Sequence, residues 1–253
     1  MAPPNWHICR PATVLVIAIV GAIPAAAQSP SQSRVEISAN VGAQTGASKL
    51  TESHVRVSNG GETETITVDH GVTTGLGFNV GAAVRIVPQF WVGVQYAVAD
   101  MKPGASITTV VPHPLLFSAP RTAQGSIDDV VHNEQNVHVD LMYALPVRAV
   151  DVKVMGGPTF FNLKQDFVSG VTVNETYPFD TAAFASATTK QLSKAAVGFN
   201  AGVDISRLLT SQMGVGALIR YSRAEVKFDD PDIGQQTVKA GGVEVVGGVR
   251  FRF

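Results

Sequence analysis

The chain has 253 residues and a formal net charge of −1, from 19 basic and 20 acidic side chains. This balance, with no concentrated basic stretch, argues against a nucleic-acid partner, because phosphate binding needs a basic surface. Hydrophobic residues make up 45% of the chain and charged residues only 15%, yet no apolar run reaches the length of a membrane-spanning helix. The apolar residues are instead spread singly, as they are in alternating β-strands.

The first residues have the organisation of a secretory signal peptide. A short, weakly basic lead (1–10) precedes an apolar run (14–23), and three alanines (25–27) supply small residues for cleavage. The apolar run is about half the length that spans a bilayer, so a retained membrane helix is the weaker alternative. The expected organisation is a signal peptide over 1–27, a short lead over 28–34 and one β-barrel domain over 35–253.

Eight later segments alternate in side-chain character with a period of two, which is typical of β-strands with two different faces. The last of them ends in Phe251-Arg252-Phe253. Short and long connections alternate between the segments, which predicts an all-β, eight-stranded, antiparallel up-and-down barrel with long loops at one rim. The expected strands are 35–44, 76–86, 90–99, 137–145, 150–155, 197–205, 213–221 and 241–253.

One face of these segments is apolar, with aromatic residues near the strand ends. The other face mixes glycine with charges of both signs, and small residues suit a narrow lumen. The charges are expected to pair across the lumen, because an unpaired buried charge is very unfavourable. The candidate lumen network is Glu36, Arg85, Asp140, Asp151, Lys153, Asp204, Arg220, Glu244, Arg250 and Arg252.

Alternation by itself does not separate a membrane barrel from a soluble one such as a lipocalin, which places its apolar face inside. The combination of charges and glycines on the polar face, with aromatic girdles on the other, favours the membrane barrel. The soluble barrel remains the alternative.

The long connections hold the unusual residues of the chain. The first has a turn signal at 59–61 and is expected to form a hairpin that extends the barrel, with alternation running on into the second strand. The second is fixed by prolines before an apolar triplet (115–117), and the third has an aromatic tip. His113 is expected to be a solvated turn residue, with ligand contact as the alternative. The candidate recognition residues are Pro112, His113, Pro114, Tyr177 and Phe179.

No catalytic residue, cofactor or metal ligand is predicted. The acidic turn at 229–232 could bind a divalent cation, but a Pro-Asp turn explains it without a metal. His70 and His132 lie near strand ends, yet no Ser-His-acid spacing accompanies them. The glycines recur at strand spacing and form no phosphate-binding loop.

The signal peptide, the alternating strands, the Gly156 to Phe161 segment and the terminal Phe253 together resemble the bacterial outer-membrane β-barrel-domain family, which includes OmpA-type and opacity-type barrels. The resemblance covers the expected mature chain and implies insertion into the outer membrane. It implies that Phe251 and Phe253 form the assembly signal read by the barrel-assembly machinery. The chain ends at the barrel without the peptidoglycan-binding domain of full-length OmpA-type proteins, so a cell-wall tether is not expected.

Three functional hypotheses follow. The first is a non-enzymatic surface barrel with a structural, adhesion or recognition role, whose loops meet an unidentified extracellular ligand while the barrel contacts outer-membrane lipid and lipopolysaccharide. The second is a narrow channel for small solutes, suggested by the charged lumen. The third is a lipid A modifying enzyme, because some barrels of this size carry such activity.

Overall fold

The computed structural model describes residues 33–46, 49–57, 61–147 and 150–253. The expected signal peptide (1–27) and most of the expected lead (28–34) lie outside the described residues. Among the described residues, we find no helix with the length and apolarity needed to cross a membrane.

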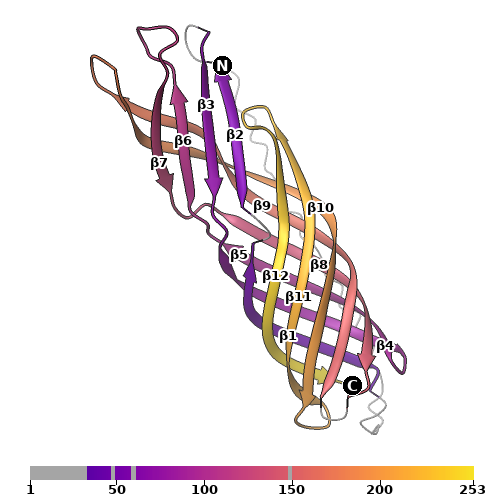
Figure 1. The fold of residues 1–253 in the computed structure, drawn as a ribbon. Coiled ribbons are helices and arrows are strands. Elements are labelled where there is room, and N and C mark those ends of the chain that lie inside the picture. Colours follow the sequence, from indigo (N-terminus) through magenta and orange to yellow (C-terminus); the bar gives the residue numbers. More distant parts are fainter. Residues whose placement is uncertain (1–32, 47–48, 58–60, 148–149) are drawn as a thin grey trace, which may run out of the picture.

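Eight strands close into an antiparallel barrel in the order β1-β12-β11-β10-β9-β8-β5-β4 (Figure 1). Each of the eight predicted segments corresponds to one of them, with only residues 150 and 253 lying beyond the strand ends, so the predicted fold is confirmed. The barrel strands are β1 (Val35–Thr45), β4 (Thr74–Val87), β5 (Phe90–Met101), β8 (His132–Leu145), β9 (Asp151–Glu175), β10 (Ala182–Leu208), β11 (Met213–Asp230) and β12 (Gly234–Arg252).

The last strand closes the barrel against the first. Glu36 lies opposite Arg252 in the β1–β12 ladder, and β1 pairs on its other side with β4. The backbone of Phe253 continues this contact, because its N–H donates to the carbonyl of Val35 at 2.9 Å and its carbonyl accepts from the Val35 N–H at 3.1 Å. The C-terminal residue therefore completes the ladder at the rim with the short turns.

The first two long connections fold into a second sheet, which was not predicted. Its strands are β2 (Leu50–Val57), β3 (Thr63–His70), β6 (Ala105–Val111) and β7 (Arg121–Ile127), in the order β2-β3-β6-β7. The first connection is a hairpin, as expected. The expectation that its alternation runs on into the second barrel strand is wrong, because β3 ends at His70 and pairs with β6 instead. This pairing satisfies backbone groups that an irregular connection would leave open.

Strands β9 to β12 extend well beyond the predicted segments, and their pattern inverts partway along. In β9 the outward side chains change from exposed Phe160 to exposed Asn162 and Lys164, while the buried side chains change from Thr159 to Phe161. The outer face thus changes from apolar to polar where the inner face changes from polar to apolar. The inversion marks the level at which the surroundings change from lipid to water.

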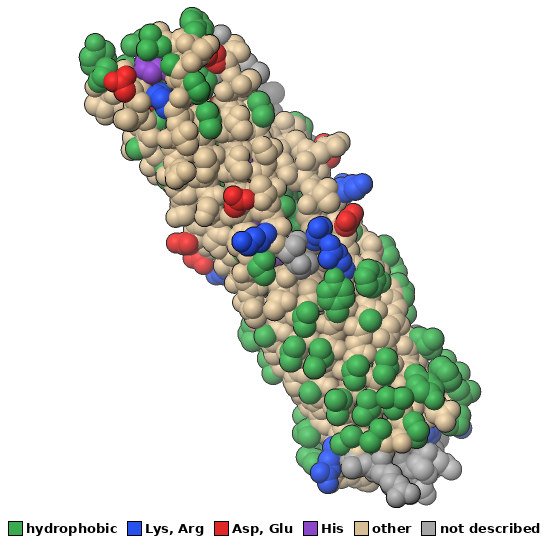
Figure 2. Space-filling view, in the orientation of Figure 1, with side chains coloured by type: hydrophobic (Ala, Val, Ile, Leu, Met, Phe, Trp, Pro, Cys, Tyr) green, Lys and Arg blue, Asp and Glu red, His purple; other side chains and the backbone are tan. Residues whose placement is uncertain are grey.

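The same change occurs in β11. Its outward apolar side chains run from Met213 to Tyr221, and the outward residues that follow, Glu225 and Lys227, are charged and exposed. Eight residue steps of about 3.3 Å at a tilt of about 40° span roughly 20 Å, near the height of the apolar band of outer-membrane barrels. Figure 2 shows exposed hydrophobic side chains spread over the lower part of the visible face, with charged side chains gathered near the upper edge of this band.

Above the belt, the extended strands and the second sheet enclose their own hydrophobic core. One cluster joins Ile66 of β3 and Ile107 of β6 to Val168 of β9, with Phe184 of β10 packed against it. A second cluster contains Phe161, Phe167, Phe228 and Val238 from β9, β11 and β12. We call this upper part, formed by β2, β3, β6, β7 and the ends of β9 to β12, the outer sandwich.

Candidate lumen network and outer tip

The structure places eight of the ten residues of the candidate lumen network in buried positions. Arg85 and Asp151 are only partly buried. Arg85 lies 5.8 Å from the ring centroid of Trp91, and the Asp151 side chain is 48% exposed. The eight buried residues are Glu36, Asp140, Lys153, Asp204, Arg220, Glu244, Arg250 and Arg252.

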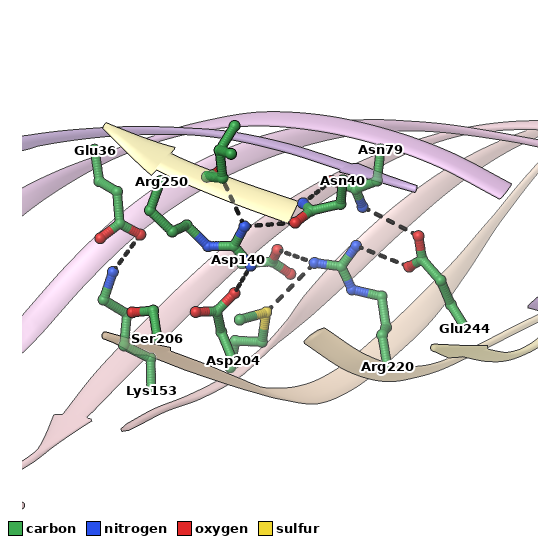
Figure 3. Close-up of polar contacts among 12 residues, drawn as sticks. Glu36, Asn40, Asn79, Asp140, Lys153, Asp204, Ser206, Arg220, Glu244 and Arg250 are labelled. Atoms are coloured by element: carbon green, nitrogen blue, oxygen red, sulfur yellow. Dashed lines mark hydrogen bonds and ion pairs between the residues drawn. The ribbon is translucent and has the colours of Figure 1, made fainter. Parts of the chain in front are cut away.

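Arg220 lies at the centre of one group of lumen charges (Figure 3). Its Nη2 donates to Asp140 Oδ2 at 2.9 Å, and its Nη1 lies 3.5 Å from Glu244 Oε2. Asn79 Nδ2 donates to the other oxygen of Glu244 at 3.2 Å. The side chains of Arg220 and Asp140 are fully buried, so each ion compensates a charge that has no access to water.

Two further groups lie toward the rim with the short turns. Arg250 contacts Asp204 through Nη2. Glu36 accepts from Lys153 Nζ at 2.5 Å and from Arg252 Nε at 2.6 Å. The ion pairs of the lumen therefore connect strands that are far apart in the sequence.

Apolar side chains fill the space between these ions. Trp91, Met142 and Met155 pack together within the barrel, and Lys153 Nζ lies 4.5 Å from the Trp91 ring centroid. The cavity beside Glu36 and Lys153 has a volume of about 10 Å³, which is at the lower limit for a single water molecule. This level of the lumen is packed with side chains.

Sequence reasoning missed Glu134, which closes the upper lumen. It is fully buried and accepts from Gln44 Nε2 at 2.8 Å and from the Gly241 N–H at 2.9 Å. His132 Nε2 lies 2.9 Å from Glu134 Oε1, the oxygen that also accepts from the Gly241 N–H. Glu134 has the same parity as the inward residue Asp140, so extending the alternation before residue 137 would have revealed it.

A buried His-Glu-His cluster ties the second sheet to the hairpin between β11 and β12. Glu52 of β2 contacts His54 Nε2 at 3.2 Å and also contacts His70 of β3, while His54 Nδ1 donates to the Ile233 carbonyl at 2.7 Å. Burial acts to raise the pKa of Glu52, but the hydrogen bonds from both histidines outweigh it and lower that pKa. The hydrogen bond to Glu52 raises the pKa of His54. Sequence reasoning did not connect these residues.

The candidate recognition residues come together at the far end of the outer sandwich. Arg121, which the sequence analysis did not select, joins the two loops that carry them. Its guanidinium donates to the carbonyls of Phe179 at 2.8 Å and Pro112 at 2.6 Å, and pairs with Glu175 at 2.5 Å. The ring centroids of Tyr177 and Phe179 are 5.9 Å apart.

The expectation that His113 is a solvated turn residue is wrong. His113 is 8% exposed, and its Nδ1 accepts from the N–H groups of Leu115 and Leu116, each at 3.1 Å. Its ring lies edge-on to Phe179 at 6.4 Å. The imidazole holds the turn between Pro114 and the apolar triplet from the inside.

The acidic turn at the β11–β12 tip contains a cation supplied by the chain. Lys190 Nζ lies 2.8 Å from Asp230 and 2.9 Å from Asp232. The hydrogen bond from Lys190 lowers the pKa of Asp230. Among the residues the structure describes, no group of three or more His, Cys, Asp or Glu side chains is arranged to hold a metal ion.

Comparison with family models and with curated proteins found no match. Among solved structures, the chain is similar to the outer membrane protein OprG from Pseudomonas aeruginosa, with 12% identity, 89% of this chain and 99% of that chain covered, and a TM-score of 0.49. It is also similar to Neisserial surface protein A (12% identity, 87% and 97% covered, TM-score 0.45) and to the outer membrane protease OmpT from Escherichia coli (11% identity, 87% and 97% covered, TM-score 0.46).

These similarities are too weak to carry an argument about function, and the assignment rests on the chain's own architecture. The strands close without a free edge in the lipid zone, the outer face carries an apolar belt of membrane height, and the charges face inward and pair. Only closed barrels and helices satisfy the backbone within a bilayer, and barrels with this pattern belong to the outer membrane. The chain is an eight-stranded β-barrel of the bacterial outer membrane.

Proposed function

We propose that the protein is a non-enzymatic surface protein whose filled barrel anchors the outer sandwich, and that the tip of the sandwich recognises an extracellular partner. The observation that carries this proposal is a group of large apolar side chains exposed at the tip. Leu115, Leu116 and Phe117 are 64%, 57% and 78% exposed, and Tyr177 on the neighbouring loop is 77% exposed. Clustered exposed apolar and aromatic residues are typical of interaction surfaces.

The backbone beneath this group is held firmly, which supports a recognition role. Arg121 ties both loops together, and His113 fixes the turn that presents the triplet. Phe179 adopts a φ of 74°, a left-handed conformation that a bulky residue keeps only when its surroundings impose it. A pre-ordered surface loses less conformational entropy on binding.

The packed lumen supports an anchor over a channel. Ion pairs and the Trp91, Met142 and Met155 side chains fill the barrel beside a cavity of about 10 Å³. A water-filled path would require several of these groups to move together. The channel alternative predicts steady single-channel conductance in planar bilayers, whereas the anchor predicts none.

The contacts of the two rim histidines support a non-enzymatic role. His70 is bound to Glu52, and His132 to Glu134 and Gln165. A hydrolase or acyltransferase site needs a hydroxyl or thiol nucleophile within reach of its base. The lipid A enzyme alternative predicts a mass change in lipid A when the protein is produced, and our proposal predicts an unchanged lipid A spectrum.

The recognition proposal is tested on cells that display the protein. The triple variant Leu115→Ser, Leu116→Ser and Phe117→Ser removes the exposed triplet, and Val72→Ser, which is 50% exposed near the barrel rim, serves as the matched control. We expect wild type and control to bind a panel of immobilised matrix glycoproteins and cultured epithelial cells, and the triple variant to lose that binding at equal surface level. The proposal fails if wild type binds no better than cells without the protein, or if the triple variant binds as wild type does.

A further inference from the structure

A pocket of about 180 Å³ lies at the junction of the barrel rim and the outer sandwich. Its walls come from the ends of β1, β3, β5 and β8 and from parts of β2, β9 and β12. For scale, a cavity of about 150 Å³ accepts a ligand the size of benzene. The pocket lies just above the apolar belt, at the height where lipid headgroups meet water.

The side chains that line this pocket are basic, hydroxylated or apolar apart from the amide of Gln165, and none is acidic. Lys49 and Lys239 supply two ammonium groups, and His70 and His132 supply two imidazoles. Leu50 and Met101 add apolar surface. The combination suits a small anion with an apolar portion.

His132 carries a positive charge in this arrangement. Gln165 Nε2 donates to the Asp166 carbonyl at 3.0 Å, which turns Gln165 Oε1 toward His132 Nδ1. His132 Nδ1 must therefore donate. Its Nε2 faces Glu134, whose carboxylate oxygens already accept from Gln44 and from the Gly241 N–H, so Nε2 donates to the carboxylate as well. With hydrogen on both nitrogens, the ring is an imidazolium.

His70 offers an unused polar atom. Its Nε2 is bound to Glu52. Its Nδ1 has no hydrogen-bond partner, and the residue is only 3% exposed, so water does not satisfy this nitrogen. An unsatisfied buried nitrogen costs free energy that a ligand would recover. Asp69 and Asp128 line an adjoining, more open space that shares Lys49 and His70, so the acidic side chains lie outside the pocket itself.

We propose that this pocket binds a phosphate monoester that carries a short apolar group. The phosphate is held by Lys49, Lys239 and the His132 imidazolium, donates its P–OH hydrogen to His70 Nδ1, and directs its apolar part toward Leu50 and Met101. Two sources share this chemistry: the phosphorylated headgroup of an outer-leaflet lipid, and a free phosphate ester from outside the cell. This site is separate from the tip and does not depend on its role.

The test uses the full mature protein folded in nanodiscs of uncharged lipid, titrated with hexyl phosphate, with hexanol as the uncharged probe. Binding is followed by calorimetry and by the histidine ring resonances. The variant Lys49→Gln with Lys239→Gln removes two exposed charges of the pocket, and Lys164→Gln with Lys194→Gln removes two exposed charges of β9 and β10 elsewhere. Both pairs preserve the hydrogen bonds of the buried network.

We expect hexyl phosphate to bind wild type and the control pair equally, to shift the His70 resonances, and to bind the Lys49/Lys239 pair about tenfold more weakly or worse, because two nearby charges are lost. The proposal is overturned if hexyl phosphate does not bind, if hexanol binds equally well, or if the pocket pair binds as tightly as the control. Repeating the titration in nanodiscs that contain phosphorylated lipid A identifies the source. Competition assigns the site to the lipid headgroup, and unchanged binding assigns it to a free ester.

Discussion

Replacing Arg220 with methionine tests whether the lumen ions stabilise the barrel as a mutually compensated group. The substitution keeps an unbranched side chain but leaves Asp140 and Glu244 without the guanidinium that lies 2.9 Å from one and 3.5 Å from the other. At an effective dielectric constant of about 20, each contact is worth roughly 5 kcal/mol of Coulomb energy, part of which offsets desolvation of the ions. Breaking a buried ion pair in this way costs about 3–5 kcal/mol of unfolding free energy.

Trp91 makes the measurement direct, because it is buried in the lumen and is the only tryptophan after residue 6. Urea unfolding in lipid vesicles, followed by its fluorescence, should show the loss for Arg220→Met. The variant that also carries Asp140→Asn and Glu244→Gln should recover most of it, because no uncompensated charge remains. Arg207→Met, at an exposed position of β10, should change stability by less than about 0.5 kcal/mol.

The reasoning is refuted if Arg220→Met unfolds within about 1 kcal/mol of wild type, since this is below any reasonable cost of leaving buried carboxylates unpaired. It is also refuted if the neutralised triple variant is no more stable than Arg220→Met. If Arg220→Met does not assemble, assembly of the triple variant provides the comparison.

Three further predictions concern other parts of the molecule. The contribution of His54 to outer-sandwich stability is complete below its ordinary pKa of 6.5 and is lost as pH rises through the raised value, while that of Glu52 is complete above 4.5 and is lost as pH falls through the lowered value. Protection of the β3 amides, taken as the exchange rate relative to the intrinsic rate at each pH, should therefore be greatest between pH 4.5 and 6.5, with His70 and Arg56 as the neighbouring ionisable side chains. Protection that does not change with pH, or an unchanged alkaline limb in His54→Gln, would contradict this. Gly125→Val should destabilise the outer sandwich by about 1–3 kcal/mol and speed its proteolysis, because a Cβ at Gly125 would lie 2.2 Å from the Phe184 ring; equal cleavage rates would count against it. Phe253→Asp should lower the amount of assembled barrel without changing signal-peptide cleavage, as seen by gel mobility of unheated samples, and normal levels would disprove the assembly role.

The barrel could be predicted because the side chains of its two faces differ in character at most positions. Along 213–221 outward apolar side chains alternate with inward residues that are small or charged except for Leu218, and the lipid environment requires an apolar outer face of each barrel strand. The outward and inward faces of the barrel strands agree with the sequence pattern.

The outer sandwich could not be predicted in the same way. Beyond Phe160 and Tyr221 the strands continue, but the environment outside changes from lipid to water, and the apolar face moves to the inside. A prediction that follows the apolar residues of one face alone therefore ends the strand at this point. The partner of each lumen charge was equally hidden, because the contact between Arg220 and Asp140 depends on how β11 faces β8 across the barrel. Likewise, the ring of His113 contacts that of Phe179, which is 66 positions away in the sequence and is brought to it by tertiary structure alone.

The inversion of faces is the central claim, and cysteine accessibility in vesicles measures it most directly. The only cysteine, Cys9, lies in the expected signal peptide, so single cysteines can be placed without background in the mature chain. Phe160→Cys and Ile219→Cys should resist a membrane-impermeant thiol reagent, while Lys164→Cys and Glu225→Cys, farther along the same strands, should react quickly. Equal reactivity of the two positions in each strand would contradict a lipid boundary at this level.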